Sequence, residues 1–174
     1  MRIYLVGYMG CGKSTLGLNL AKSLGLSFID LDKYIEERNC RTVPQLFEEL
    51  GESGFRNKER QALEEVSQFS EVVIATGGGA PCFFDNMELM NETGITLFMD
   101  IDPAILAERL LKSKTDRPLI RGKNREQLVH FITETLQKRV PFYSKAQIRI
   151  TRPDEAVAIA SREIAIITGK RIKK

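Results

Sequence analysis

The chain has 174 residues, with 26 Lys and Arg against 23 Asp and Glu, so its formal net charge is only +3. This length suits one domain with a complete hydrophobic core, and 43% apolar with 28% charged residues excludes a disordered or fibrous chain. No apolar run approaches the ~20 residues of a membrane helix, the first one is too short for a signal peptide, and the small basic excess argues against nucleic-acid binding. The three cysteines lack the number and spacing of a disulfide or zinc framework, which favours a reduced, cytoplasmic protein.

Hydrophobic periodicity predicts strands that alternate with helices along the whole chain. The predicted strands are residues 2–6, 26–31, 71–75, 95–99 and 146–150. The predicted helices are residues 16–24, two or three segments of 33–70 broken by Gly51 and Gly54, a segment begun by Asp102 and Pro103, residues 126–140 and a closing helix from Pro153. Residues 112–125 are basic and aperiodic, which indicates an exposed loop. This pattern is typical of an α/β domain with a parallel sheet covered on both faces.

A glycine-rich loop over residues 7–14 (GYMGCGKS) fits the pattern G-x-x-x-x-G-K-[ST] between a predicted strand and a predicted helix. Its glycines let successive backbone N–H groups converge on one anion, and the helix that begins near Lys13 adds the positive end of its dipole. Lys13 would reach the β- and γ-phosphates, and the Ser14 hydroxyl would complete a Mg²⁺ shell. The loop therefore predicts binding of a nucleoside triphosphate.

A glycine-rich loop of this kind, called a P-loop, occurs in several classes of protein, and the chain lacks the second motif that most of these classes require. A GTPase needs Asn-Lys-x-Asp, and the nearest string, residues 57–60, ends in Arg. Motor ATPases place a Glu after the strand-end acid, whereas Ile101 follows Asp100. A small-molecule kinase remains, with its acceptor at the carboxyl ends of strands next to the loop.

Five segments lie where such an acceptor would bind, and two of them are basic: Arg117 lies in a loop that would otherwise be a solvated connection, and Arg139 lies near a helix end, where its charge could complement the helix dipole. Asp30 and Asp32 are two residues apart at a strand end, so both can point the same way, although a polar strand exit would look similar. Residues 77–79, three glycines after a buried strand, form either a tight turn or a close approach of backbone to a ligand. Arg56 is either a surface arginine over a buried ring or a ligand contact.

Together these segments resemble the shikimate kinase family. The resemblance covers roughly residues 2–150 and rests on six motifs in order: GxMGxGKST (7–15), FIDLD (28–32), GExxFRxxE (51–59), GGGA (77–80), RPL (117–119) and RxPxY (139–143). It implies a three-layer fold like that of nucleoside monophosphate kinases, with a five-stranded parallel sheet in the order 2-3-1-4-5. It also implies a single P-loop kinase domain over residues 1–174, with a shikimate-binding subdomain at 33–60 and a lid at 112–124.

The resemblance further implies a role for each matching residue. ATP would be bound by Gly10, Cys11, Gly12, Lys13, Ser14, Thr15, Arg109 (beside adenine) and Arg117 (from the lid). Shikimate would be bound by Asp32, Arg56, Gly77, Gly78, Gly79 and Arg139, with Glu59 orienting Arg56. Ser14 and Asp30 would hold Mg²⁺, Asp30 through water. Lys13, Asp32 and Arg117 would be catalytic.

The implied activity is transfer of the ATP γ-phosphoryl group to the 3-hydroxyl of shikimate, in the pathway to chorismate and the aromatic amino acids. We expect a cytoplasmic monomer whose partners are shikimate and ATP, with Mg²⁺. The alternative within kinases is a gluconate-type sugar-acid kinase, which also pairs a P-loop with a carboxylate acceptor. Outside enzymes, a nucleotide-gated binding module would retain the P-loop without an acceptor site.

Overall fold

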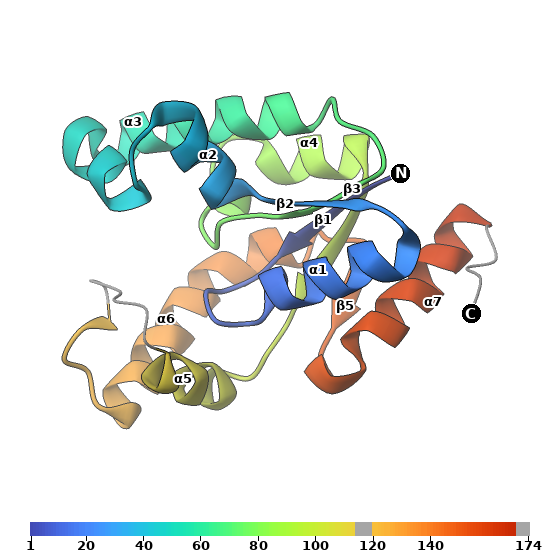
Figure 1. The fold of residues 1–174 in the computed structure, drawn as a ribbon. Helices are drawn as coiled ribbons and strands as arrows, with labels where there is room; N and C mark the ends of the chain where they lie inside the picture. The colour runs from blue at the N-terminus through green and yellow to red at the C-terminus, as the bar shows by residue number, and fades with distance from the viewer. Residues whose placement is uncertain (114–119, 170–174) are drawn as a thin grey trace.

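A parallel sheet of five strands forms the centre of the computed structural model, which describes residues 1–113 and 120–169 (Figure 1). The strand order β2-β3-β1-β4-β5 confirms the predicted order and α/β class. The strands are β1 (Arg2–Val6), β2 (Ser27–Asp30), β3 (Val72–Ala75), β4 (Ile95–Met99) and β5 (Ile148–Ile150).

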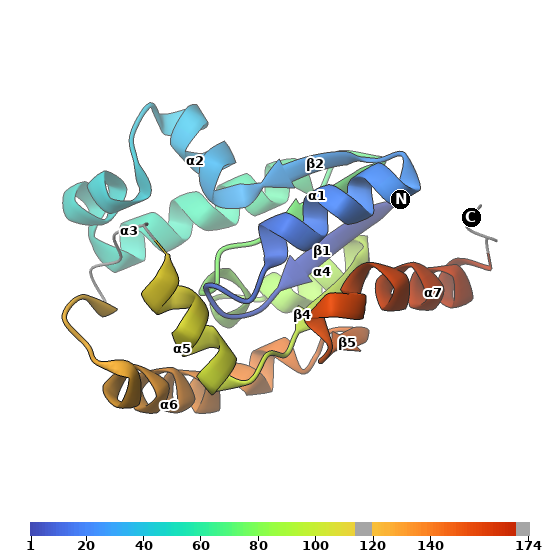
Figure 2. The same ribbon diagram turned by 60° about the horizontal axis from the view of Figure 1, so that its bottom comes forward.

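Helices cover both faces of this sheet (Figures 1 and 2). The α-helices are α1 (Lys13–Leu24), α2 (Leu31–Asn39), α3 (Val43–Val66), α4 (Asn86–Thr93), α5 (Pro103–Lys112), α6 (Arg125–Tyr143) and α7 (Ala156–Thr168). The short 3₁₀ turns that lie wholly within the described residues are η1 (Ala80–Cys82) and η3 (Pro153–Glu155). Among the described residues, no helix is long and apolar enough to cross a membrane.

The alternation of side chains along β1 divides the interior into two cores. Ile3 and Leu5 face a core built with α1, α5, α7 and the first half of α6. Tyr4 and Val6 face a second core, built with α2, α3, α4 and the end of α6. All four side chains are fully buried. The central strand is therefore fixed from both sides, and it carries the glycine-rich loop at its carboxyl end.

The second strand is one residue shorter at each end than predicted, because a helix begins immediately after it. Asp30 is the N-cap of α2, and its Oδ1 accepts a hydrogen bond from the Lys33 backbone N–H at 3.4 Å. Asp32 consequently lies in the first turn of α2, so the prediction that it belongs to a strand end was wrong.

The predicted break at Gly54 is also wrong. Only Gly51 departs from helical geometry inside α3, with φ 66° and ψ −179°, and the helix runs on through Gly54. A positive φ is the conformation that glycine adopts without a steric penalty, so the kink is at Gly51. Arg56 therefore lies in the helical part of α3 that follows this kink.

The other boundaries differ by a few residues. β3 begins after Glu71, whose φ of 55° is incompatible with an extended strand. β5 begins at Ile148, two residues later than predicted, and α6 continues three residues beyond the predicted end, with Pro141 inside it. The closing helix begins with η3, and α7 follows from Ala156.

We predict that Gly94→Ala destabilises the fold by about 1–3 kcal/mol, the usual cost of overpacking a close contact. The φ of Gly94 is −170°, which any residue adopts, so the effect comes from the contact alone. A Cβ here would lie 2.6 Å from the Arg2 carbonyl oxygen and 2.9 Å from the Tyr4 ring, and the start of β1 would have to move. Urea unfolding measures the loss, with the exposed Glu92→Ala as control, and an unchanged free energy of unfolding would contradict this packing.

Candidate functional site

The glycine-rich loop joins β1 to α1. Gly10 and Gly12 have φ of 77° and 103°, values that side chains strongly disfavour. Lys13 begins α1, and its Nζ donates hydrogen bonds to the carbonyl oxygens of Gly7 (2.8 Å) and Tyr8 (3.0 Å). The curled backbone, the helix N-terminus and this ammonium group together favour an anion.

A cavity of about 510 Å³ opens beside this loop, at the carboxyl ends of β1, β2 and β3. Both aspartates line it, although Asp30 caps α2 and Asp32 lies within it. The full lining is Met9, Gly10, Gly12, Lys13, Ser14, Thr15, Asp30, Asp32, Lys33, Thr76 and Gly78. The cavity thus joins the loop to residues that follow the second and third strands.

A second cavity, of about 340 Å³, lies on the other side of the loop. Arg109 of α5 borders it, and its Nη1 donates to the Cys11 carbonyl oxygen at 3.0 Å. The other lining residues are Gly10, Cys11, Gly12, Thr15, Leu16, Asn19, Met99, Pro153, Ala156 and Val157. Pro153 and Val157 were not predicted as site residues, because the segment after residue 150 carries no motif and only the fold brings it to the loop.

Ser14 and Asp30, the two residues that we predicted to hold a metal, lie together beside the loop. The Ser14 hydroxyl donates to Asp30 Oδ2 at 2.9 Å. A hydroxyl and a carboxylate are hard oxygen donors of the kind that Mg²⁺ accepts. The described residues contain no group of three or more His, Cys, Asp or Glu side chains that could hold a metal. The pair fits a magnesium ion only with further oxygen ligands from phosphates and water.

The turn at residues 77–79 is packed so closely that a side chain on Gly77 or Gly79 would overlap its neighbours. A Cβ on Gly77 would lie 2.8 Å from Asp32 Oδ1 and 2.9 Å from Glu59 Oε1. A Cβ on Gly79 would lie 2.5 Å from Arg56 Nη2. The absence of side chains on the turn therefore lets an acid pair and a guanidinium group lie directly against its backbone.

The third glycine of the turn, Gly78, brings in α6. A Cβ on Gly78 would lie 3.3 Å from Arg139 Nη1, and its carbonyl oxygen accepts a hydrogen bond from the Tyr143 hydroxyl. Arg139 also lies over the Tyr8 ring, with its guanidinium carbon 5.6 Å from the ring centroid. Two arginines, from α3 and α6, thus meet at the turn that borders the larger cavity.

The Arg56 guanidinium is fixed in place, and one of its donors is buried without a partner. Its Nη1 lies 2.6 Å from Glu59 Oε2, with side chains 11% and 1% exposed. The centroid of the Phe83 ring lies 4.2 Å from its guanidinium carbon, an aromatic contact that no motif predicted. Among the described residues, its buried Nε has no hydrogen-bond partner. A buried donor without an acceptor is costly.

Burial dominates the electrostatics of the two acids at the turn. It raises the pKa of the Asp32 carboxyl, the negative charge of Asp30 adds to the rise, and Lys13 opposes it. Burial also raises the pKa of Glu59, against the opposing effect of Arg56. A raised pKa makes Asp32 a better proton acceptor when it is ionised.

The described residues therefore bring together nearly every residue in the expected site. The loop residues, Asp30 and Asp32 line the larger cavity, Arg109 lies at the smaller one, and Arg56 and Arg139 contact the glycine turn. Arg117 lies outside the described residues, together with the rest of residues 114–119 of the expected lid. The arrangement can hold a polyphosphate at the loop and a small acid near the turn.

Comparison with known proteins gives one consistent result. The family model described as "SKI: Shikimate kinase" matches residues 9–168. A shikimate kinase of Phocaeicola vulgatus is 58% identical over 146 residues, which are 84% of this chain and 83% of that protein.

Solved structures agree with this result. A shikimate kinase from Bacteroides thetaiotaomicron has a TM-score of 0.88 and 46% identity, covering 97% of this chain and 98% of that one. The enzyme from Acinetobacter baumannii in complex with shikimate has a TM-score of 0.83 and 36% identity, covering 99% and 95%. A gluconokinase from Sinorhizobium meliloti, at 17% identity and a TM-score of 0.61, shares the fold alone.

Thiol labelling tests the geometry of the glycine turn through Cys82, which is half-buried near both arginines. Burial raises the pKa of its thiol above the ordinary 9.0. We predict that iodoacetamide modifies the exposed Cys40 first and Cys82 several-fold more slowly. The Cys82 rate should continue to rise as the pH increases past 9, because only the thiolate reacts. Peptide mass spectrometry follows each site, and a Cys82 rate that levels off at lower pH would contradict its burial.

Proposed function

The chain belongs to the shikimate kinase family, and from this membership we propose how its residues divide the work of the reaction. The enzyme transfers the γ-phosphoryl group of ATP to the 3-hydroxyl of shikimate, which gives shikimate 3-phosphate and ADP. This is a step in the synthesis of chorismate and the aromatic amino acids.

We propose that ATP lies along the glycine-rich loop and spans both cavities. The N–H groups of Gly10, Gly12 and their neighbours, together with Lys13, bind the phosphates. The smaller cavity, bordered by Arg109 and Pro153, receives the adenosine. The support is that the loop borders both cavities, so one nucleotide can lie in both.

We propose that shikimate lies between the loop and the turn at residues 77–79. Arg56 and Arg139 bind its carboxylate, because a guanidinium offers parallel donors that match a carboxylate. Asp32, within the larger cavity, accepts a hydrogen bond from the ring hydroxyl that reacts. The observation that carries this assignment is the convergence of both arginines on one turn, with the Arg56 Nε donor left without a partner among the described residues.

Ser14 and Asp30 are our proposed protein contacts of Mg²⁺, Asp30 through water. A bound Mg²⁺ would supply positive charge to the phosphates and orient them. The support is the close Ser14–Asp30 pair and its oxygen-only chemistry.

The residues of the chain then supply charge and alignment. Phosphoryl transfer passes through a loose, anionic transition state, so positioning and positive charge matter more than a strong base. Lys13 provides that charge from the loop, and Asp32 orients the hydroxyl and takes its proton late. Its raised pKa suits it to hold that proton.

The remaining proposals rest on the family. A lid at residues 112–124 brings Arg117 to the phosphates, and residues 33–60 act as the shikimate-binding subdomain of a single domain. We also propose a cytoplasmic monomer, and its three free cysteines support a reduced compartment. No observation favours gluconate as acceptor. ADP release with gluconate in place of shikimate should remain at the background rate.

Lys13→Met should lower kcat by about 100-fold, because it removes a charge that contacts the transition state. The exposed Lys22→Met, on the same helix, serves as control and should leave kcat within twofold of the parent value. A coupled assay of ADP release measures both. Near-normal turnover in Lys13→Met would contradict the assignment of the loop.

Arg56→Lys should raise the KM for shikimate by about 10- to 100-fold, equivalent to about 1–3 kcal/mol, because a lysine cannot give two parallel donors. The KM for ATP should stay within twofold. Arg41→Lys, in an exposed ion pair with Glu49, is the matched control. An equal loss of affinity for both substrates would indicate a folding defect and contradict the proposed carboxylate site.

A further inference from the structure

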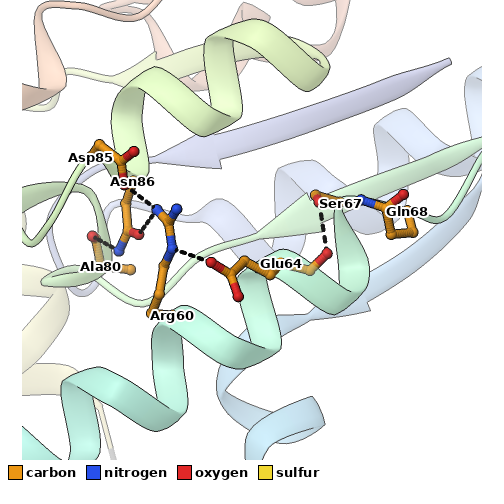
Figure 3. Close-up of polar contacts among 7 residues, drawn as sticks. All are labelled: Arg60, Glu64, Ser67, Gln68, Ala80, Asp85 and Asn86. Carbon is orange, nitrogen blue, oxygen red and sulfur yellow. Dashed lines mark hydrogen bonds and ion pairs between the residues drawn. The ribbon is translucent and has the colours of Figure 1, made fainter.

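Arg60 of α3 is the centre of a polar network outside the known motifs (Figure 3). Its Nη1 lies 2.6 Å from Asp85 Oδ1 and donates to Asn86 Oδ1 at 2.9 Å. Its Nε donates to Glu64 Oε1 at 2.7 Å. The Arg60 side chain is 21% exposed, so the network is partly shielded from water.

Asn86 extends this network to the glycine turn. Its side chain is fully buried, and its Nδ2 donates to the Ala80 carbonyl oxygen at 2.8 Å (Figure 3). Ala80 is the residue after Gly79. Because both ends of the Asn86 amide are engaged, loss of the Arg60 partner would leave a buried acceptor unsatisfied.

Arg60 and Arg56 are four residues apart on α3 and therefore lie on the same side of the helix. Arg56 contacts Gly79 and Phe83, and Arg60 contacts Asp85 and Asn86. The segment 79–86 is consequently attached to α3 at two points one helical turn apart. The close approach of Gly79 to Arg56 leaves little room for this segment to slide.

We propose that Arg60 is a positioning residue for shikimate binding, which acts through Asn86 and Ala80 on the glycine turn and thereby fixes the Arg56 guanidinium. This inference rests on the proposed function, in which Arg56 and the turn bind the shikimate carboxylate. Arg60 itself touches neither substrate. We expect Arg60 to affect the binding of shikimate and not of ATP, because the network connects α3 with the segment after β3 and includes no residue of the glycine-rich loop.

The test is steady-state kinetics of Arg60→Met. The KM for shikimate should rise about tenfold, a fraction of the about 100-fold loss that a 1 Å misplacement can cause, while the KM for ATP stays within twofold. Arg60→Lys keeps a charge but only a single donor group, and its KM should lie between those of the parent and Arg60→Met. Arg162→Met, which removes an exposed ion pair with Glu163 on α7, is the matched control and should leave both KM values unchanged.

A double variant separates positioning from general destabilisation. Asn86→Ala and Arg60→Met each break the same chain of contacts to the glycine turn, and each should raise the shikimate KM. Their combination should therefore raise it by much less than the product of the single effects. If Arg60→Met fails to fold, Glu64→Gln weakens the network from its exposed end and should give a smaller rise confined to shikimate.

Three results would overturn the inference, and they are distinguishable. If Arg60→Met leaves the shikimate KM unchanged while Arg56→Lys raises it, Arg60 has no positioning role and the proposed function stands. If neither variant changes it, the carboxylate site itself is wrong. If both substrates lose affinity equally in Arg60→Met, Arg60 only stabilises the fold.

Discussion

The structure depends on how closely the turn at residues 77–79 approaches its neighbours. A Cβ on Gly77 would overlap Asp32 and Glu59, and one on Gly79 would overlap Arg56. Only bare backbone allows these charged groups to meet at one place. Burying charged groups is costly unless opposite charges are paired. Here the Arg56 guanidinium pairs with the buried Glu59 carboxylate at 2.6 Å. One buried donor of this guanidinium, Arg56 Nε, has no hydrogen-bond partner among the described residues.

The strand order places this turn between the two aspartates and the glycine-rich loop. β3 lies between β2 and β1, so the turn after β3 borders both the aspartates that follow β2 and the loop that follows β1. A parallel sheet gathers all three carboxyl ends at one edge. Phosphates at the loop and a carboxylate at the arginines can then be held apart across one cavity, with Asp32 inside it.

The sequence was sufficient for the features that local chemistry determines. The loop motif, the apolar strands and the capping residue Asp102 need no tertiary information, and each was predicted at or near its position. The predictions failed where the surrounding structure determines the conformation of a residue. Asp30 ends a strand because it caps a helix, and Gly54 stays helical despite its low propensity. Phe83 and Pro153 belong to no motif, and only folding brings them to the site.

A crystal structure with shikimate and ADP would show whether the two arginines hold the acid at the glycine turn. We predict the shikimate carboxylate within hydrogen-bond distance of Arg56 and Arg139, and the 3-hydroxyl beside Asp32 on the side of the glycine-rich loop. A carboxylate bound at Lys13, or an acid bound away from the turn at residues 77–79, would contradict it.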